Sequence, residues 1–518
     1  MVQQNLSSAS QILSSLRNPK VIMMLALGFS AGLPIMLIFS SLSLWLREAG
    51  LQKSTVTMFS WAALGYSFKF IWAPLVDRLP VPVLTEKLGR RRSWILVSQF
   101  AVMLSIGLMA FCDPAESGNA LTWMAVFAVM LGFSSATQDI VIDAFRIESA
   151  EQQWQAMMSA SYIAGYRVGM LAAGAGVLYL ASWHGTDVGN YQFAAWRFAY
   201  LSMVACMLIG VVTTLLVPEP DTGQRASDSG SVHDQVELCM LFVTGVAVFI
   251  GSYVFTSDIA ATTKTALAES MGNKGLASVL AEFVRLAIAL GLAAGVSVAL
   301  VSIGLVKRHV VQTSYVLPVS EFFSRYGRTA IVLLLLIGLY RVSDIVLGVV
   351  SNVFYQDLGY SKNEIATAVK TFGLLMSILG GFLGGALSLV FGVMPLLFAG
   401  AVLACVTNLL FYLLANIGYS LGWMYVVVGL DNLAAGLASA AFVAFLSALT
   451  NVRFTAVQFA LFTSLMTLLP KVLGGYSGQI VDAMGYQWFF VFTFVLGLPV
   501  LLLVYLSRHC ISGSSVTD

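Results

Sequence analysis

Long apolar runs alternate with short polar loops along most of this chain. We identify fourteen runs of the length of a membrane span at residues 20–46, 54–76, 93–112, 121–146, 155–182, 194–217, 237–257, 277–306, 329–356, 363–388, 390–415, 421–449, 455–481 and 486–507. A spanning helix needs about 20 mostly apolar residues. The runs at 237–257 and 277–306 are the weakest, and a short polar loop is expected between them. These runs are too long and continuous for a membrane β-barrel, whose strands alternate over about 10 residues.

The order of the runs predicts two six-helix halves with two extra transmembrane helices between them. The first half is expected at residues 1–217 and the second at 329–518. Residues 218–328 form a linker that starts with the polar stretch PEPDTGQRASDSGSVHDQ and contains the two extra helices. We therefore expect an all-α polytopic membrane protein with fourteen spans.

Two loops that occupy corresponding places in the halves resemble each other. WLREAGLQKSTV, from Trp45, aligns without a gap with FYQDLGYSKNEI, from Phe354. The match pairs Gly50 with Gly359. A weaker match pairs Trp196 with Trp488, each at the start of the last span of its half. Duplicated halves around a central site are typical of secondary transporters.

Composition agrees with a membrane protein. The chain is 58% hydrophobic and 10% charged, whereas soluble domains carry about 25% charged residues. Most loop lysines and arginines fall on one side of the membrane if both termini are cytoplasmic, as the positive-inside rule requires. The five cysteines form no CxxC pair, so neither a disulfide framework nor a metal site is expected.

The fourth run ends in TQDIVIDAFR, which places Asp139 and Asp143 on one helix face. A carboxylate at membrane depth costs about 2.5 kcal/mol or more. One interpretation is that Asp143 snorkels to the cytoplasmic surface with Arg146 as its partner. The other is that these aspartates line a wet, gated cavity and carry a proton across the membrane. We expect Asp139 to be the proton carrier and Asp143 to be the second candidate.

Other polar groups within the runs are few. The cations are Lys69, Arg167, Arg341, Lys370 and Lys471, and they attract an anion if they face one cavity. Asp344 follows Arg341 at a spacing that also permits an ion pair within one helix. We expect a polar and aromatic lining for the cavity from Phe29, Tyr66, Gln138, Tyr166, Tyr340 and Asn432. The glycines Gly165, Gly169, Gly174 and Gly176 give the fifth run a small-residue face for close packing.

The loop after the second run, APLVDRLPVPVLTEKLGRRRSW, resembles the loop signature of the major facilitator superfamily. Asp77, Arg78, Arg90 and Arg91 match the signature residues that latch neighbouring helices on the cytoplasmic side. Ala73 replaces the first glycine of the signature, and about ten residues are inserted before Gly89. The alternative is a basic loop that only follows the positive-inside rule.

An enzyme is not expected. The four histidines, His184, His233, His309 and His509, lie outside the spans without metal-ligand spacing. The sequence GYSLG at 418–422 fits a nucleophile motif but lacks its strand–turn–helix context. No phosphate-binding Walker loop is present. No cofactor or metal is therefore predicted.

Segments of both halves share a further pattern. They are LGFSAGLPIML, YSFKFIWAPLVDR, GRRRSWIL, SSATQDIVIDAFR, GYRVGML, LYRVSDIVL and VRFTAVQFALFTSL. Together these segments resemble the AmpG muropeptide permeases, a branch of the major facilitator superfamily. The resemblance implies proton-driven import of N-acetylglucosaminyl-1,6-anhydro-N-acetylmuramyl peptides from the periplasm. These products feed peptidoglycan recycling and, in some bacteria, β-lactamase induction and antibiotic resistance.

The resemblance also implies the partners and the location. We expect a small-molecule substrate, protons and the bilayer of the bacterial inner membrane, both termini in the cytoplasm, no nucleic acid, and a monomer. Two other functions stay open: a carrier of another anion such as acetyl-CoA, and a membrane sensor that binds its ligand without transporting it.

Overall fold

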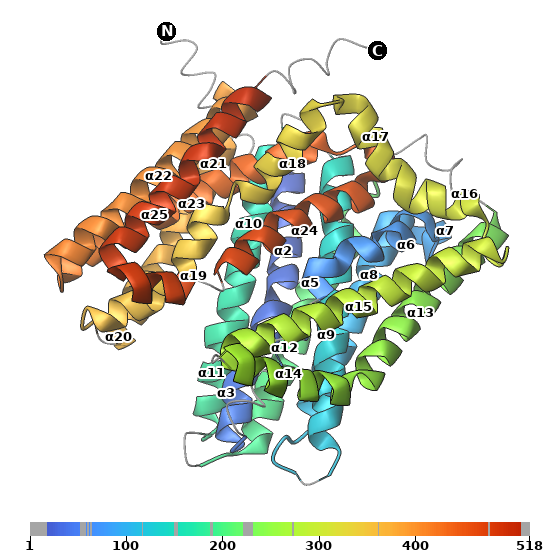
Figure 1. Cartoon of the computed structure of the whole chain (residues 1–518), viewed down its shortest axis with the longest axis horizontal. Coiled ribbons are helices and arrows are strands. Elements are labelled where there is room, and N and C mark those ends of the chain that lie inside the picture. Colours follow the sequence, from blue (N-terminus) through green and yellow to red (C-terminus); the bar gives the residue numbers. More distant parts are fainter. Residues whose placement is uncertain are drawn as a thin grey trace. The chain divides into compact units, whose positions relative to one another are not determined.

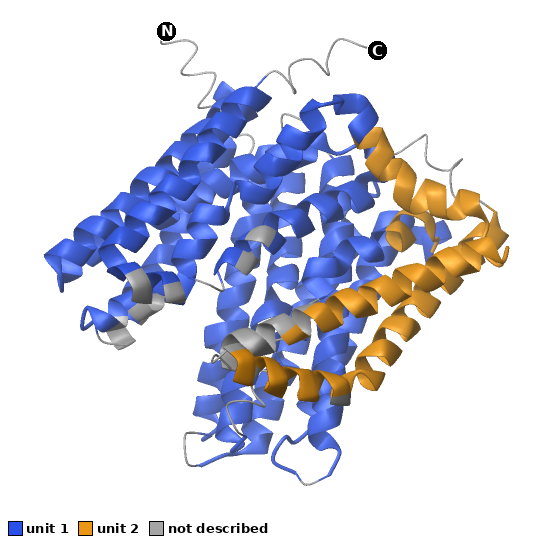
Figure 2. Cartoon of the chain, in the orientation of Figure 1, with its two compact units in different colours: residues 1–73, 81–222, 323–518 blue, residues 74–80, 223–322 orange. Residues whose placement is uncertain are grey.

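The computed structural model describes residues 18–51, 59, 62, 65–116, 118–149, 154–186, 190–220, 231–271, 274–360, 362–474 and 477–508. Its elements are all helices (Figure 1), which confirms the predicted all-α class. The chain divides into two compact units (Figure 2). Residues 1–73, 81–222 and 323–518 form the first unit, and residues 74–80 and 223–322 form the second. Both expected six-helix halves belong to the first unit, apart from residues 74–80 of the N-terminal half.

The N-terminal half consists of long helices and shorter segments between them. Its elements are α2 (Pro19–Ile38), α3 (Ser40–Glu48), α5 (Gly65–Phe68), η2 (Lys69–Ile71), α6 (Ala73–Arg78), α7 (Leu84–Leu88), α8 (Arg90–Ala110), α9 (Ala120–Ser149), α10 (Gln155–Leu171), η4 (Ala172–Gly176), α11 (Val177–Trp183) and α12 (Phe193–Leu216). Helix α6 belongs almost entirely to the second unit.

The C-terminal half has the same kind of construction. Its elements are α18 (Thr329–Leu339), α19 (Val342–Asp357), α20 (Lys362–Ile365), η7 (Ala366–Phe372), α21 (Gly373–Phe391), α22 (Val393–Ile417), α23 (Leu421–Leu449), η8 (Val452–Phe454), α24 (Thr455–Gly474) and α25 (Ser477–Ser507). Within the first unit the halves meet where α10 packs against α21 and α23 and where α24 packs against α9, α5 and η2.

The second unit is built around three helices, α13 (Val232–Phe255), α14 (Ser257–Met271) and α15 (Lys274–Ser302), followed by α16 (Arg308–Val311), η6 (Gln312–Val316) and most of α17 (Leu317–Tyr326). Both α13 and α14 pack against α15. The prediction of a short polar loop between the two extra spans was wrong, because that stretch forms α14. Its threonines and charged residues are compatible with a helix that does not span a membrane.

Among the described residues, twelve helices are long and apolar enough to cross a membrane, so the predicted count of fourteen is not confirmed. The two extra runs are among the twelve, as Val232–Phe255 and Val284–Ser302. The run predicted at 54–76 lies partly outside the described residues, and its described part is divided among α5, η2 and α6. The run predicted at 455–481 contains Pro470, and its apolar stretch Val452–Leu468 is shorter than a span.

The two loops that resemble each other in sequence share a backbone conformation. Gly50 has a φ of 88° and Gly359 a φ of 89°. Glycine adopts this left-handed region at little cost, unlike residues with a side chain. The shared geometry supports the duplication that the loop match predicts.

The carboxylates before these glycines also have corresponding partners. Glu48 accepts a hydrogen bond from Trp196 Nε1 at 2.9 Å, and Asp357 accepts one from the Tyr486 hydroxyl. Each partner lies near the start of the last long helix of its half. Trp196 and Trp488 both lie at the start of the last span of their half, as the weaker match predicted, but their surroundings differ, since Trp196 is fully buried while Trp488 is 65% exposed. Tyr486, and not Trp488, makes the hydrogen bond that corresponds to that of Trp196.

Glycines bring α2 and α10 into backbone contact. A Cβ atom at Gly165 would lie 1.9 Å from the Leu25 carbonyl oxygen, and one at Gly169 would lie 2.2 Å from that of Phe29. The small-residue face predicted for this helix is therefore confirmed at these two positions. At Gly176 a Cβ atom would meet open space, so the face does not extend that far.

The first turn of α8 is capped by a carboxylate from another part of the chain. Glu219 accepts hydrogen bonds from the backbone N–H groups of Arg91 at 2.7 Å and Arg92 at 3.0 Å. A Cβ atom at Gly89 would lie 2.4 Å from the Glu219 side chain. Burial raises the pKa of the Glu219 carboxyl, while the two N–H groups act in the opposite direction. The glycine before the arginines is therefore needed for this cap.

Arg91 also ties α8 to the end of α9. Its guanidinium donates from Nε and Nη2 to Glu148, with an Nη2–Oε1 distance of 2.6 Å, and both side chains are 1% exposed. Arg91 therefore joins neighbouring helices, as a latch residue does. Asp77 and Arg78 lie in the second unit. The four-residue latch, which also includes Arg90, stays a prediction.

Replacing Gly165 with Ala is expected to lower stability by about 1–3 kcal/mol, the usual cost of overpacking. The added methyl group would force α2 and α10 apart. Thermal unfolding of the detergent-solubilised protein measures this as a lower midpoint. The control is Gly107→Ala, because Gly107 lies within a helix and faces open space, where alanine favours the helix. Equal midpoints for both variants would contradict the packing argument.

Replacing either Arg91 with Met or Glu148 with Gln is expected to lower stability by about 3–5 kcal/mol, because each change leaves a buried group without its partner. The double variant is expected to recover part of this loss. Denaturation of all four proteins gives the coupling energy. Lys20→Met serves as control, since it removes only an exposed hydrogen bond to the Ser149 carbonyl at the same end of α9. Strictly additive losses would show that the pair is not coupled.

Candidate transport site

Asp139 and Asp143 lie one turn apart on α9, and each is 8% exposed. Every side chain from Ser134 to Ile147 on this helix is buried. A helix that is buried all round lies inside a protein and not against lipid. The two carboxyl groups are therefore surrounded by other helices.

Asp143 lies between two cations. Lys69 Nζ is 3.9 Å from its Oδ2 atom, and Arg146 Nη2 is 3.6 Å from its Oδ1 atom. The snorkelling interpretation was right about Arg146 as partner but wrong about the surface, because Arg146 is fully buried. Charges buried in this way must be compensated locally.

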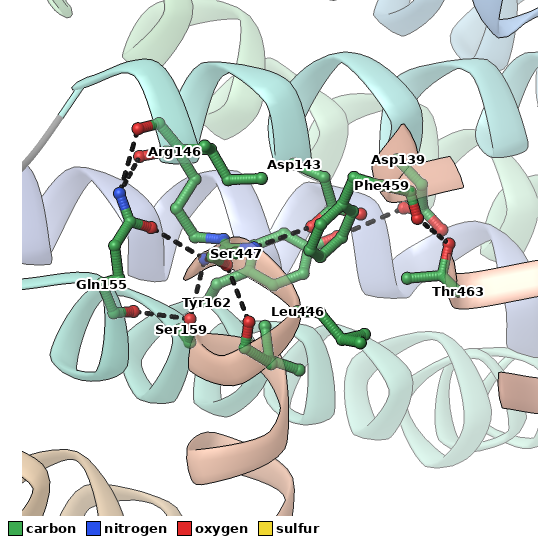
Figure 3. A network of polar contacts seen from close by, with 12 residues as sticks. Asp139, Asp143, Arg146, Gln155, Ser159, Tyr162, Leu446, Ser447, Phe459 and Thr463 are labelled. Atoms are coloured by element: carbon green, nitrogen blue, oxygen red, sulfur yellow. Dashed lines mark hydrogen bonds and ion pairs between the residues drawn. The ribbon is translucent and has the colours of Figure 1, made fainter. Parts of the chain in front are cut away.

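Arg146 joins the two halves (Figure 3). Its Nη1 atom donates to Gln155 Oε1 at 3.1 Å and to Ser159 Oγ at 2.8 Å, both on α10. The same atom donates to Ser447 Oγ on α23 at 2.9 Å. The guanidinium also lies 5.3 Å from the centre of the Phe459 ring on α24. One buried cation thus contacts side chains of both halves, and the stacking on Phe459 adds a cation–π attraction.

Asp139 has a different environment one turn away. It accepts a hydrogen bond from the Tyr162 hydroxyl at 3.2 Å. Among the described residues it forms no ion pair of the kind that holds Asp143. The Tyr162 ring lies next to that of Tyr166, with 6.1 Å between ring centres. Asp139 is thus a buried carboxyl group bound by a hydroxyl donor.

The segment around Lys69 is fixed to α9 by side-chain hydrogen bonds. Tyr66 donates to Ser135 at 2.6 Å, and Trp72 Nε1 donates to Thr137 at 3.0 Å. The α5 and η2 parts of this segment also contact α24 of the other half. The structure therefore brings two predicted residues, Tyr66 and Lys69, to the same side of α9 as the aspartates.

Two further predicted cations lie where the halves meet. Arg167 is on α10, and Arg341 is at the break between α18 and α19. Arg341 Nη1 donates to Ser439 on α23 at 2.9 Å. Within the described residues Arg341 and Asp344 interact electrostatically but form no ion pair. The helical spacing that permits such a pair is present, since Ile345 N–H donates to the Arg341 carbonyl at 3.1 Å.

The acids of the C-terminal half lie near each other. Asp344 and Asp431 interact electrostatically, and Asp431 accepts a hydrogen bond from Thr407 at 3.1 Å. The fourth helix of this half therefore has an acid, but not at the place of Asp139.

Four of the predicted lining residues form hydrogen bonds or packing contacts within their own halves. Gln138 donates to Ser30 at 3.1 Å, Tyr340 donates to the Leu397 carbonyl at 3.0 Å, and Asn432 donates to the Val428 carbonyl at 2.9 Å. Phe29 packs against the apolar core of the N-terminal half. These contacts explain the four side chains without a substrate, and their role in binding stays a prediction.

The side chains of Lys370 and Lys471 lie outside the described residues. Within the described part of the chain, no three histidine, cysteine, aspartate or glutamate side chains come together as metal ligands.

Several residues of the network were not selected from the sequence. Tyr162, Gln155, Ser159 and Ser447 carry no charge and have ordinary neighbours. The spacing of Asp143 and Arg146 indicated one contact, and it is present. The link to Ser447 crosses 301 positions of the chain, and no local pattern indicates such a contact.

Comparison with known proteins gives one family match and a set of relatives. Residues 20–218 match the family model of acetyl-coenzyme A transporter 1. A protein of Rickettsia felis named putative transporter AmpG 4 is 28% identical over 93% of this chain and 95% of its own length. The anhydromuropeptide permease of Escherichia coli K12 is 28% identical over 98% of this chain and 84% of its own length.

Solved structures show the fold. A proton:xylose symporter of the major facilitator superfamily, XylE, covers 96% of both chains with a TM-score of 0.57 and 13% identity. The transporter FucP in its outward conformation covers 94% of this chain and 98% of its own, with a TM-score of 0.56 and 12% identity. These relatives and this fold belong to transporters and not to enzymes. The resemblance found in the sequence is therefore confirmed: this chain is a homologue of the AmpG permeases over most of its length, with the fold of the major facilitator superfamily.

Proposed function

We propose that this protein imports N-acetylglucosaminyl-1,6-anhydro-N-acetylmuramyl peptides across the bacterial inner membrane in symport with protons. The names of its relatives over nearly the whole chain support this substrate. The observation that carries the coupling mechanism is the buried aspartate pair at the contact between the halves. The imported sugars feed peptidoglycan recycling and, through it, β-lactamase induction.

Asp139 carries the proton in this proposal. Its carboxyl group is buried with a hydroxyl donor but without an ion-pair partner in the described part of the chain. Asp143 is held between Lys69 and Arg146 and offsets one of their two positive charges. A proton on Asp139 removes a buried negative charge, so the loaded carrier changes conformation at a lower electrostatic cost.

Arg146 closes the cytoplasmic side in this mechanism. The basic residues near the end of α9 favour the cytoplasm for that end under the positive-inside rule. Release of substrate into the cytoplasm then requires the contact of Arg146 with Ser447 and Phe459 to break. The loss of these partners must be offset by water or by a stronger pair with Asp143.

A carrier of acetyl-CoA is the second candidate, and the match of residues 20–218 to an acetyl-coenzyme A transporter favours it. A nucleotide with several phosphates needs a concentrated group of free cations. In the buried network Lys69 and Arg146 are already paired with Asp143. The charge balance therefore favours a substrate with fewer negative charges.

The test is uptake of radiolabelled anhydro-disaccharide peptide into proteoliposomes under an imposed inward proton gradient. The wild type is expected to concentrate the label only with the gradient. Asp139→Asn, which cannot release a proton, is expected to exchange internal for external label but to concentrate none. Asp113→Asn is the control, because Asp113 lies in a loop outside the spans, and it is expected to behave as wild type.

Two results would contradict the proposal in different ways. Concentrative uptake by Asp139→Asn would exclude Asp139 as the proton carrier while the substrate assignment stands. No uptake by the wild type, together with gradient-driven uptake of acetyl-CoA, would replace the proposed substrate with the second candidate.

A further inference from the structure

Arg167 is a cation without a hydrogen-bond or ion-pair partner among the described residues. It lies on α10, the helix that packs against both α21 and α23 of the other half. Ala156, Met157 and Ala160 of α10 surround Gly385 of α21. Two turns further along, Arg167 is largely enclosed, and no residue in the described part of the chain hydrogen-bonds or ion-pairs with it. A charge in this position costs free energy unless something compensates it.

Arg341 is a second cation, and it lies near Arg167. Its Nη1 atom is fixed to Ser439, which lies on α23 among the residues that α21 contacts. The charges of Arg167 and Arg341 act on each other. One cation thus comes from each half, and the two approach where those halves meet.

The balance of charge around the two arginines is positive. Asp344 attracts Arg341 electrostatically but forms no ion pair with it among the described residues. The charge of Asp344 also interacts with that of Asp431. The other two buried acids, Asp139 and Asp143, interact electrostatically with Lys69, and Asp143 also interacts with Arg146. Two like charges repel strongly in a medium of low dielectric constant. The repulsion resists closure of the halves at this place.

We propose that Arg167 and Arg341 together bind one carboxylate of the transported substrate, and that this anion lets the two halves close around it. The inference rests on the proposed function and adds the charge requirement of its substrate. The arginine fork matches a carboxylate with two parallel hydrogen bonds. A ligand without the anion enters the same site but leaves the repulsion in place.

The carboxylate has two possible sources in a muropeptide, the muramyl acid of a peptide-free sugar and the acids of the stem peptide. Uptake into proteoliposomes is therefore measured for the anhydro-disaccharide acid, for its neutral amide, and for the disaccharide tripeptide. The wild type is expected to prefer at least one acid over the amide by about tenfold in kcat/KM, as the loss of a charge-assisted hydrogen bond implies. The preferred acid identifies the source.

Arg167→Gln and Arg341→Gln are expected to abolish the preference for the acid. Uptake of the acid falls, chiefly through KM, whereas uptake of the amide does not fall, because each change also removes the repulsion between the arginines. The double variant is expected to be no worse than either single variant, because both arginines bind the same anion. Arg197→Gln is the control, since Arg197 lies on α12 over the Phe193 ring. Equal losses for acid and amide, or a wild type without preference, would overturn the inference while the proposed function stands.

Thermal unfolding of the detergent-solubilised protein tests the same inference without transport. Without ligand, Arg167→Gln is expected to unfold at or above the wild-type temperature, because it removes the repulsion. N-acetylmuramate is expected to raise the unfolding temperature of the wild type but not that of Arg167→Gln. Neutral N-acetylglucosamine is expected to affect the unfolding temperatures of the two proteins equally. A lower midpoint for Arg167→Gln without ligand, or stabilisation of both proteins by the acid, would overturn the anion site. Arginine-dependent stabilisation in a protein that transports no muropeptide would retain the anion site and reject the proposed function.

Discussion

The structure depends on the need to compensate charge where water is excluded. Arg146 has no exposed surface, and its guanidinium is bound by three side-chain oxygens, one carboxylate and one aromatic face. Neither half supplies this whole set. A buried cation that loses part of its shell costs several kcal/mol. The contact between the halves is therefore held by a group that neither half stabilises alone.

This constraint links the aspartates to the contact between the halves. Separation of α9 from α23 and α24 removes Ser447 and Phe459 from Arg146 and changes the field on Asp143. Lys69 then becomes the remaining fixed counter-charge of that carboxylate. The charge state of the pair and the arrangement of the halves cannot vary independently. A carrier needs this kind of linkage if a bound proton is to favour one arrangement over another.

The sequence allowed prediction of features that local patterns encode. The helical class, the loop duplication at Gly50 and Gly359, and the close packing at Gly165 follow from hydrophobic length, turn chemistry and small-residue spacing. Contacts between distant segments, such as Arg91 with Glu148, could not be predicted, because no periodicity relates their positions. Tyr340 and Asn432 illustrate another limit. A polar group in an apolar helix can face a cavity or bond to a neighbouring carbonyl, and its own sequence is the same in both cases.

The charges at the contact between the halves are compensated unevenly. Around Lys69 and Arg146 the protein supplies Asp143 and Asp139, so this part is neutral without a ligand when both carboxylates are ionised. Around Arg167 and Arg341 the protein supplies an excess of one sign. A permanent partner for Arg167 would remove the cost but would also occupy the place of a substrate anion. An uncompensated cation in a membrane protein is thus tolerable where a transient ligand completes the balance, and this distinguishes a part that binds from a part that holds the halves together.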